Sequence, residues 1–219
     1  TSSIMIGDAT TGTIDAANYN TGVGIDIFAA LTTGDNNTAV GYLALNANTT
    51  GTYNTAVGAS VLTANTTGNY NVAVGGVALD ANTTGATNTA IGTSALGANT
   101  TGNDNTALGS DCLSGNTTAD NNTAVGKYAL RVNTTGGSNV AVGATSLDAN
   151  TTGGTNTAIG AAAMSANTTG SGNTSLGFNS LATNTTASNN TAVGYSALLL
   201  NATGTANTAV GKDALEANT

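Results

Sequence analysis

The sequence is built from a single repeat of seventeen residues. The pattern Asn-Thr-Ala-Val-Gly that begins at Asn37 begins again, always seventeen residues further on, at Asn54, Asn71, Asn88, Asn105, Asn122, Asn139, Asn156, Asn173, Asn190 and Asn207. A further copy begins at Asn20 and a degenerate first copy at Ser3, which makes thirteen copies without insertion or deletion. A length this constant indicates that every copy follows the same closed path in a one-dimensional stack.

The consensus coil is N-T-A-V-G-x-x-A-L-x-A-N-T-T-G-x-x, and its positions are numbered 1 to 17 from here on. Position 5 is glycine in all thirteen copies, and position 4 is always valine, isoleucine or leucine. Seventeen residues are too few for the paired helices of a helical repeat, and glycine, asparagine and threonine are poor helix formers. The sequence therefore predicts an all-β fold, a parallel β-solenoid (β-roll or β-helix) of thirteen coils.

Within each coil we expect a short strand at T-A-V, a glycine corner, a second short strand around A-L-x-A, and a turn at N-T-T-G-x-x. Side chains alternate along a strand, so positions 2 and 4 share one face and position 3 the other. We expect position 4 and the leucine at position 9 to form a thin core, with small outward alanines such as Ala39, Ala56 and Ala90. The glycines at positions 5 and 15 are expected to supply backbone angles that other residues resist.

Residues 1–36 differ from the consensus. Ile14 and Leu31 replace the asparagine of position 12, and Ile25, Ile27 and Phe28 make the second coil bulkier. Because the terminal copies of a repeat stack are usually atypical, residues 1–36 are predicted to be divergent N-terminal coils that form a cap or a transition. Residues 37–219 are predicted to be a regular solenoid that is truncated, or that continues, at its C-terminal end.

The asparagine of position 12 has two interpretations. Stacked identical asparagines can form an amide ladder from coil to coil. Alternatively, triplets such as Asn48-Thr49-Thr50 match the N-x-T acceptor of N-linked glycans. The residues concerned are Asn48, Asn65, Asn82, Asn99, Asn116, Asn133, Asn150, Asn167, Asn184 and Asn201.

Two other residue types stand out. Tyr53 and Tyr70 both occupy position 17 of adjacent coils, so their rings should stack, either as a surface that binds sugar rings or as packing at an interface. Cys112, the one cysteine, occupies position 8, which is usually alanine, and is expected to fill a small slot in the core.

The charges exclude several classes of function. Only 6% of residues are charged. The three cations, Lys127, Arg131 and Lys212, are outnumbered by eleven carboxylates, which gives a net charge of −8. Nucleic acids and anionic membranes need clustered cations, and no apolar run is long enough to cross a bilayer, so neither partner is expected. Without histidine, and with one cysteine, no histidine-assisted nucleophile or zinc site can be assembled. We expect no enzyme, no catalytic residue, no metal and no cofactor.

The string N-T-A-V-G-x-x-A-L-x-x-N-T-T-G resembles the repeats of "tail fiber domain-containing" proteins of phages and aquatic bacteria. Its first half, T-A-V-G-x-x-A, is also similar to the S-V-A-I-G-x-x-A repeats of trimeric autotransporter adhesin heads, which are left-handed parallel β-rolls with a shorter coil. The resemblance covers about residues 20–219. It implies an extended, trimeric surface fibre; a monomeric solenoid with a core of small residues is the alternative.

From these observations we expect the chain to be a structural or adhesive fibre segment that acts as a rigid spacer and attachment surface. Such a segment would be the shaft or head of a virion tail fibre or of an extracellular fibre. The expected partners are copies of itself, in a homotrimer or an end-to-end filament, and a cell-surface glycan or receptor. The expected location is extracellular, on a cell surface or on a virion. One alternative is a self-polymerising extracellular filament subunit, glycosylated on the repeated asparagines. Another is an ice-binding solenoid with threonine ladders, although positions 13 and 14 are adjacent and would point to opposite faces of a strand.

Overall fold

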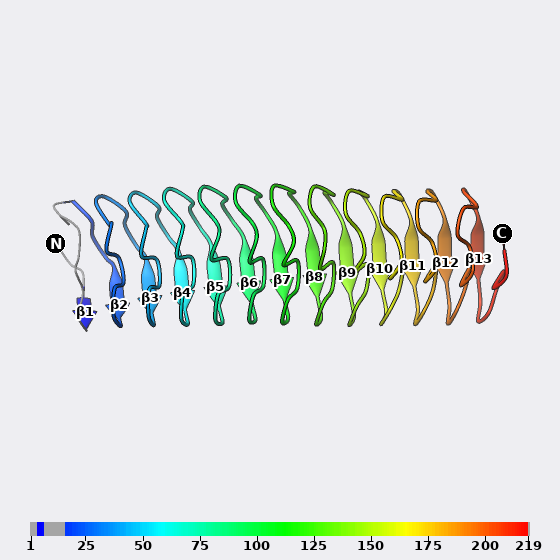
Figure 1. Ribbon diagram of the computed structural model, residues 1–219, viewed down its shortest axis with the longest axis horizontal. Coiled ribbons are helices and arrows are strands. Elements are labelled where there is room, and N and C mark those ends of the chain that lie inside the picture. Colours follow the sequence, from blue (N-terminus) through cyan, green and yellow to red (C-terminus); the bar gives the residue numbers. More distant parts are fainter. Residues whose placement is uncertain (1–3, 7–15, 219) are drawn as a thin grey trace.

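The computed structural model describes residues 4–6 and 16–218, in which the chain winds into an elongated stack of coils (Figure 1). Each coil adds one three-residue strand to a thirteen-stranded parallel sheet whose order follows the chain. The predicted all-β parallel solenoid is confirmed. The strands are β1 (Ile4–Ile6), β2 (Thr21–Val23), β3 (Thr38–Val40), β4 (Thr55–Val57), β5 (Val72–Val74), β6 (Thr89–Ile91), β7 (Thr106–Leu108), β8 (Thr123–Val125), β9 (Val140–Val142), β10 (Thr157–Ile159), β11 (Thr174–Leu176), β12 (Thr191–Val193) and β13 (Thr208–Val210).

Neighbouring strands pair in register, each residue with the one seventeen places further on. In β7 and β8, for example, Thr106 pairs with Thr123 and Leu108 pairs with Val125. Residues at one coil position therefore form a straight row along the stack, and a repeated residue type becomes a repeated surface or core feature.

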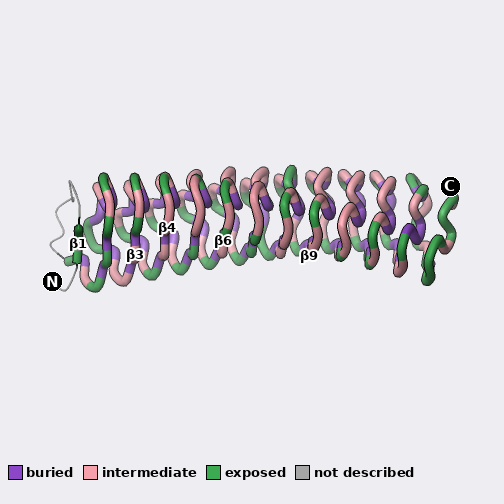
Figure 2. The backbone as a smooth tube through the Cα atoms, turned by 90° about the horizontal axis from the view of Figure 1, so that it is seen from below, coloured by how far each residue is buried: buried purple, intermediate pink, exposed green. Residues whose placement is uncertain are grey.

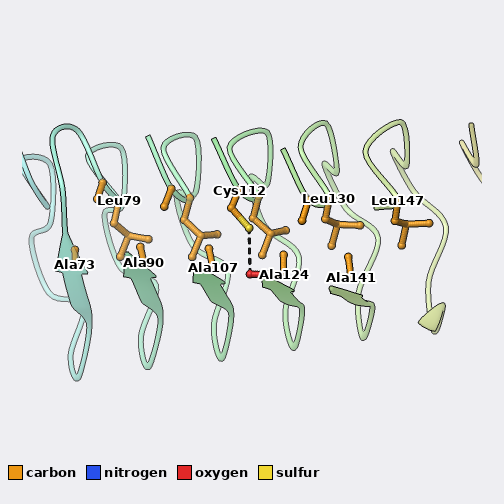
Figure 3. Close-up of a cluster of buried hydrophobic side chains, with 14 of the residues drawn as sticks. Ala73, Leu79, Ala90, Ala107, Cys112, Ala124, Leu130, Ala141 and Leu147 are labelled. Atoms are coloured by element: carbon orange, nitrogen blue, oxygen red, sulfur yellow. Dashed lines mark hydrogen bonds between the residues drawn. The ribbon is translucent and has the colours of Figure 1, made fainter. Parts of the chain in front are cut away.

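The core lies between the sheet and the opposite wall of each coil (Figure 3). Alanines of position 3, such as Ala90 and Ala107, point from the strands toward the leucines of position 9, such as Leu79 and Leu130. All four side chains are fully buried. The tube coloured by burial shows the same alternation of buried and exposed segments in successive coils (Figure 2).

The strands face the opposite way from the prediction. Ala39 is fully buried, whereas Val40 is 36% and Leu108 is 45% exposed. The physical reason is space, because the leucine of position 9 already fills the narrow interior and leaves room for only a methyl group from the sheet. Position 9 was predicted correctly as core, but position 4 was not, and the alanines that were predicted to face outward point inward.

The second strand predicted around A-L-x-A is absent from the coils that the structure describes at this segment. Positions 7 and 9 instead adopt left-handed backbone conformations, as at Ser94 (φ 55°) and Leu96 (φ 53°). Two such residues bend the chain back too tightly for an extended segment. The opposite wall is nevertheless tied from coil to coil, for example by the Leu96 N–H that donates to the Cys112 carbonyl at 3.0 Å.

The two glycine positions of the consensus coil work differently. Gly75, at position 5, has φ 124°, and a Cβ there would lie 2.7 Å from the Gly92 carbonyl carbon and oxygen, so both angle and space require glycine. At position 15, space alone favours glycine: a Cβ on Gly51 would lie 2.4 Å from the Asn48 Oδ1 atom. Alanine takes this position in other coils, as at Ala119 and Ala187, and is still buried, so the expected requirement for a special angle at position 15 is wrong.

The second coil is bulkier inside, as its sequence suggests. Ile27, Phe28 and Leu31 are fully buried, so Leu31 occupies the interior place that asparagine takes in later coils. Ile14 lies outside the described residues.

Candidate functional site: buried amide ladders and the outer sheet face

The asparagines of position 12 form a continuous ladder. The Asn65 Nδ2 group donates to Asn48 Oδ1 at 2.9 Å and to the Gly68 carbonyl at 3.1 Å. The same amide-to-amide bond links every further pair up to Asn184 and Asn201. All ten asparagines from Asn48 to Asn201 are fully buried. The row is thus an interior hydrogen-bonded column that ties each coil to the next.

This geometry argues against the glycan interpretation of the same residues. An N-linked sugar is attached to the amide nitrogen, and in Asn116 this nitrogen is buried and donates to Asn99 Oδ1 at 2.9 Å and to the Ala119 carbonyl at 3.0 Å. A folded coil leaves it no room for a sugar and no spare hydrogen. The N-x-T triplets are accounted for by the turn they form.

A second asparagine column, at position 1, was missed by the sequence reasoning. The Asn54 N–H donates to Asn37 Oδ1 at 2.9 Å, and Asn54 Nδ2 donates to the Gly68 carbonyl at 2.8 Å. The first bond links successive coils and the second closes a coil by joining its start to its end. Recurrence of asparagine in every copy from Asn20 onward was the available signal. In the described part of the chain, Asn122 Nδ2 is the one buried side-chain polar atom without a hydrogen-bond partner.

A third column uses the threonines of position 13. The Thr66 hydroxyl donates to the Thr83 carbonyl at 3.1 Å, and Thr83 repeats this toward Thr100 at 3.0 Å. These hydroxyls are engaged in holding the coils together, so they are unsuited to ordering an external water lattice.

The outward side chains of positions 2 and 4 form a surface that we call the outer face. Position 2 is threonine from β2 to β13 except at Val72 and Val140, and position 4 is valine, isoleucine or leucine throughout. No charged residue occurs in either row of these strands. The result is a long, uncharged strip with one row of hydroxyl groups beside one apolar row.

Tyr53 and Tyr70 stack as predicted, with ring centroids 4.9 Å apart and planes 4° from parallel. They are 51% and 57% exposed. Each ring covers one face of the other, which leaves at most one open face per ring for a sugar to stack on. The pair thus offers a smaller platform than two separately exposed tyrosines would.

The cations gather at other aromatic residues. Phe178 and Tyr195, both at position 6, stack at 5.5 Å, and Lys212 Nζ lies 5.8 Å from the Tyr195 ring centroid. Tyr128 is flanked by Lys127 and Arg131, 4.7 and 5.1 Å from its ring centroid. The few positive charges are therefore held locally against aromatic rings and do not form a basic patch.

The buried Cys112 side chain is kept in its neutral thiol form. Burial raises the pKa of the Cys112 thiol to about 12, and its Sγ–H donates to the Ala124 carbonyl at 3.1 Å (Figure 3). Cys112 is thus a protonated core residue, as expected. Among the described residues, no three histidine, cysteine, aspartate or glutamate side chains lie close enough to share a metal ion, and their surface contains no pocket. No helix suited to crossing a bilayer is found in the described residues.

Comparison with known protein families, curated proteins and solved structures found no match to this chain.

Proposed function

We propose that this chain is a structural or adhesive fibre segment, at a cell surface, on a virion or elsewhere outside the cell, which acts as a rigid spacer and attachment surface. The observation that carries the proposal is the unbroken in-register stack. Its coils are joined by the strand ladder and by three further columns, for example at Asn65, Asn54 and Thr66. A stack held at several points around each coil resists bending and sets a fixed distance between whatever is attached at its ends.

The same stack supports a self-polymerising filament as second candidate, because a parallel sheet can grow by adding coils at an open strand edge. The buried asparagines argue against the glycosylated version of that filament. The ice-binding alternative loses support because its outward threonine row is interrupted at Val72 and Val140 and lies beside side chains of uneven size.

Small-angle X-ray scattering of the purified chain, with mass photometry on the same sample, tests the proposal. Thirteen coils spaced by about 4.8 Å predict a thin rod about 60 Å long. A variant lacking the four coils of residues 71–138 should be about 20 Å shorter with an unchanged cross-section. Assemblies of copies, including trimers, would give integral multiples of the 20.9 kDa chain mass. A compact particle, or a flexible coil whose length does not track the number of coils, would contradict the spacer role. Continuous filaments would favour the second candidate.

A further inference from the structure

A longer period is superimposed on the coil repeat at the outer face. Strands β5 to β8 read VAV, TAI, TAL and TAV, and strands β9 to β12 read VAV, TAI, TSL and TAV. The four-coil block thus occurs twice in succession, whereas β1 to β4 and β13 do not follow it. Along the position-4 row it places two large pairs, Ile91 with Leu108 and Ile159 with Leu176, between stretches of valine. Their exposed fractions are 38%, 45%, 37% and 45%.

We propose that the outer face binds the outer face of a second copy of this chain, with the two rods antiparallel and β7 of one copy opposite β8 of the other. The inference rests on the proposed fibre role, whose attachment surface it specifies.

The sizes of the position-4 side chains favour this register. A two-fold axis parallel to the strands places position 4 opposite position 4 and reverses the order of the coils. With β7 opposite β8, strand β6 faces β9, β10 faces β5 and β11 faces β4. Each isoleucine or leucine of position 4 in β2 to β13 then faces a valine of the other copy, as Leu108 faces Val125.

Nearby registers lose this fit. Moving one rod by one coil places Leu108 opposite Leu108 of the second copy, or Ile91 opposite its Ile159. Moving it by two coils places Leu108 opposite Ile91 or Ile159. A shift of four coils that places β9 opposite β10 restores the match with fewer coils in contact, whereas the opposite shift sets Ile159 against Ile6 of the second copy. Two sheets packed face to face leave about 10 Å between them, so large side chains opposite one another would be overpacked.

The rows of positions 2 and 4 also favour the antiparallel orientation of the two rods and a second copy as the partner. A parallel pair related by an axis along the rods would place the apolar row on the threonine row, whereas the antiparallel pair buries apolar against apolar. A second copy supplies a face with the same coil spacing, on which valines lie opposite both large pairs. Neither row carries a charge that burial would leave unpaired.

The size of the contact suits a reversible dimer. Twelve strands spaced by about 4.8 Å, each about 10 Å long, give about 600 Å² in plan for each copy. The total of about 1,200 Å² lies at the lower end for stable protein interfaces.

Sedimentation velocity over a concentration series tests the pairing. The unaltered chain should form dimers, and Leu108→Lys should raise the dimer dissociation constant at least a hundredfold, because the charge would be buried at the centre. The matched control is Leu200→Lys, since Leu200 is 48% exposed but lies at position 11, away from the outer face, and should leave dimerisation unchanged. Circular dichroism checks that both variants fold.

A size exchange tests the register. Val125→Leu alone would set leucine against Leu108 of the second copy and should weaken the dimer about tenfold or more. Adding Leu108→Val should restore it, because each contact again pairs one leucine with one valine. Failure of the double variant to recover would overturn the β7-to-β8 register.

Spin labels at position 6 decide the orientation, with Cys112→Ala as background so that each label has a single thiol. In the proposed dimer, labels on Lys127→Cys are one coil apart along the axis and labels on Lys212→Cys are eleven coils apart, or about 50 Å. Similar short distances at both sites would show a parallel pair and overturn the proposal, as would a trimer, or a monomer at all concentrations. A rod-shaped monomer would overturn the pairing alone and leave the spacer role standing, whereas a compact particle would remove both.

Discussion

At the scale of single residues, the position-12 asparagines show why an amide is repeated where a hydrophobic residue would be the simpler choice. In Asn116 the amide nitrogen donates to Asn99 Oδ1 and to the Ala119 carbonyl, while its oxygen accepts from Asn133 Nδ2 at 3.0 Å. Since each amide both donates and accepts along the column, only asparagine or glutamine can continue it, and glutamine is longer by a methylene group.

Asn116→Asp tests this column with almost no change of shape. The new carboxylate would be buried and would set acceptor oxygens against the acceptors on Asn99 and Ala119. We expect a loss of about 3–5 kcal/mol in the free energy of unfolding at neutral pH, typical of an unpaired buried charge. The exposed residue Asn121 supplies the control Asn121→Asp, which should cost far less; equal losses in denaturant titrations would refute the buried-charge explanation.

Asp80 provides a pH-dependent prediction in the unaltered sequence. Partial burial raises the pKa of its carboxyl above the ordinary value, with opposing hydrogen bonds from its own backbone N–H and that of Ala81. A carboxyl with a raised folded-state pKa lowers stability when ionised, and the penalty disappears as the pH falls through that pKa toward the unfolded value of about 3.9. Asp80→Asn should therefore stabilise the chain at neutral pH but not near about pH 3. Denaturant titrations at both pH values measure the difference, and a benefit that persists in acid would contradict this cause.

At the scale of the coil, the adjacent glycines Gly75 and Gly76 show that glycine is required at one position and not at the next. Gly75 has φ 124° and a Cβ site 2.7 Å from the Gly92 carbonyl, whereas a Cβ on Gly76 would meet nothing within 4 Å. Gly75→Ala should cost about 2–4 kcal/mol, because the strained angle and the clash with the next coil act together. Gly76→Ala should be neutral or stabilising by up to about 1 kcal/mol. Thermal unfolding of both variants checks the contrast, which would be absent if the glycine corner could relax.

The sequence predicted the elements better than their orientation. The constant coil length and the glycine of position 5 were sufficient for the solenoid and for the strand at T-A-V. Which side of that strand faces inward could not be read from hydrophobicity, because Val40 is more apolar than Ala39 and yet only alanine fits opposite the leucine of position 9. The left-handed conformation of residues such as Leu96 was also unpredictable, since leucine has no intrinsic preference for it.

The features of the candidate site likewise divide into those that the sequence predicted and those that it did not. The Tyr53–Tyr70 stack and the position-12 ladder follow from residue spacing alone once the coil length is known. The position-1 column was missed because its asparagines directly precede a strand, where no local pattern indicates a buried side chain. The hydrogen bond from Asn54 to the Gly68 carbonyl depends on how the chain returns at the end of the coil, which the sequence does not show.

The inward orientation of position 3 can be tested by adjacent substitutions on β7. Ala107→Val adds two methyl groups to a fully buried site and should cost about 1–3 kcal/mol by overpacking. Leu108→Val, on the exposed side of the same strand, should change the unfolding free energy of the monomer by less than about 1 kcal/mol. Measurements at concentrations where the chain is monomeric compare the two, and a larger effect from Leu108 would mean that the strand faces the other way.

At the scale of the whole molecule, each coil touches only its neighbours, so coils should be exchangeable units and the register should matter more than the total length. Deleting residues 88–104 removes one complete coil and joins Thr87 to Asn105, which leaves position 17 followed by position 1. This variant should keep its circular dichroism per residue and unfold in one transition at slightly lower stability. Deleting residues 88–103 instead joins Thr87 to Asp104, two residues of position 17, and leaves one coil a residue too long.

The extra residue in the second variant must be expelled as a bulge, or it would shift the inward asparagine, alanine and leucine positions of the following residues toward solvent. We therefore expect the sixteen-residue deletion to be the less stable of the two by at least about 2 kcal/mol, although it removes less of the protein. Denaturant unfolding of the pair measures this directly. Equal stability would mean that single coils absorb length changes freely, and the seventeen-residue period would then need an explanation other than the columns of buried asparagine that join coil to coil.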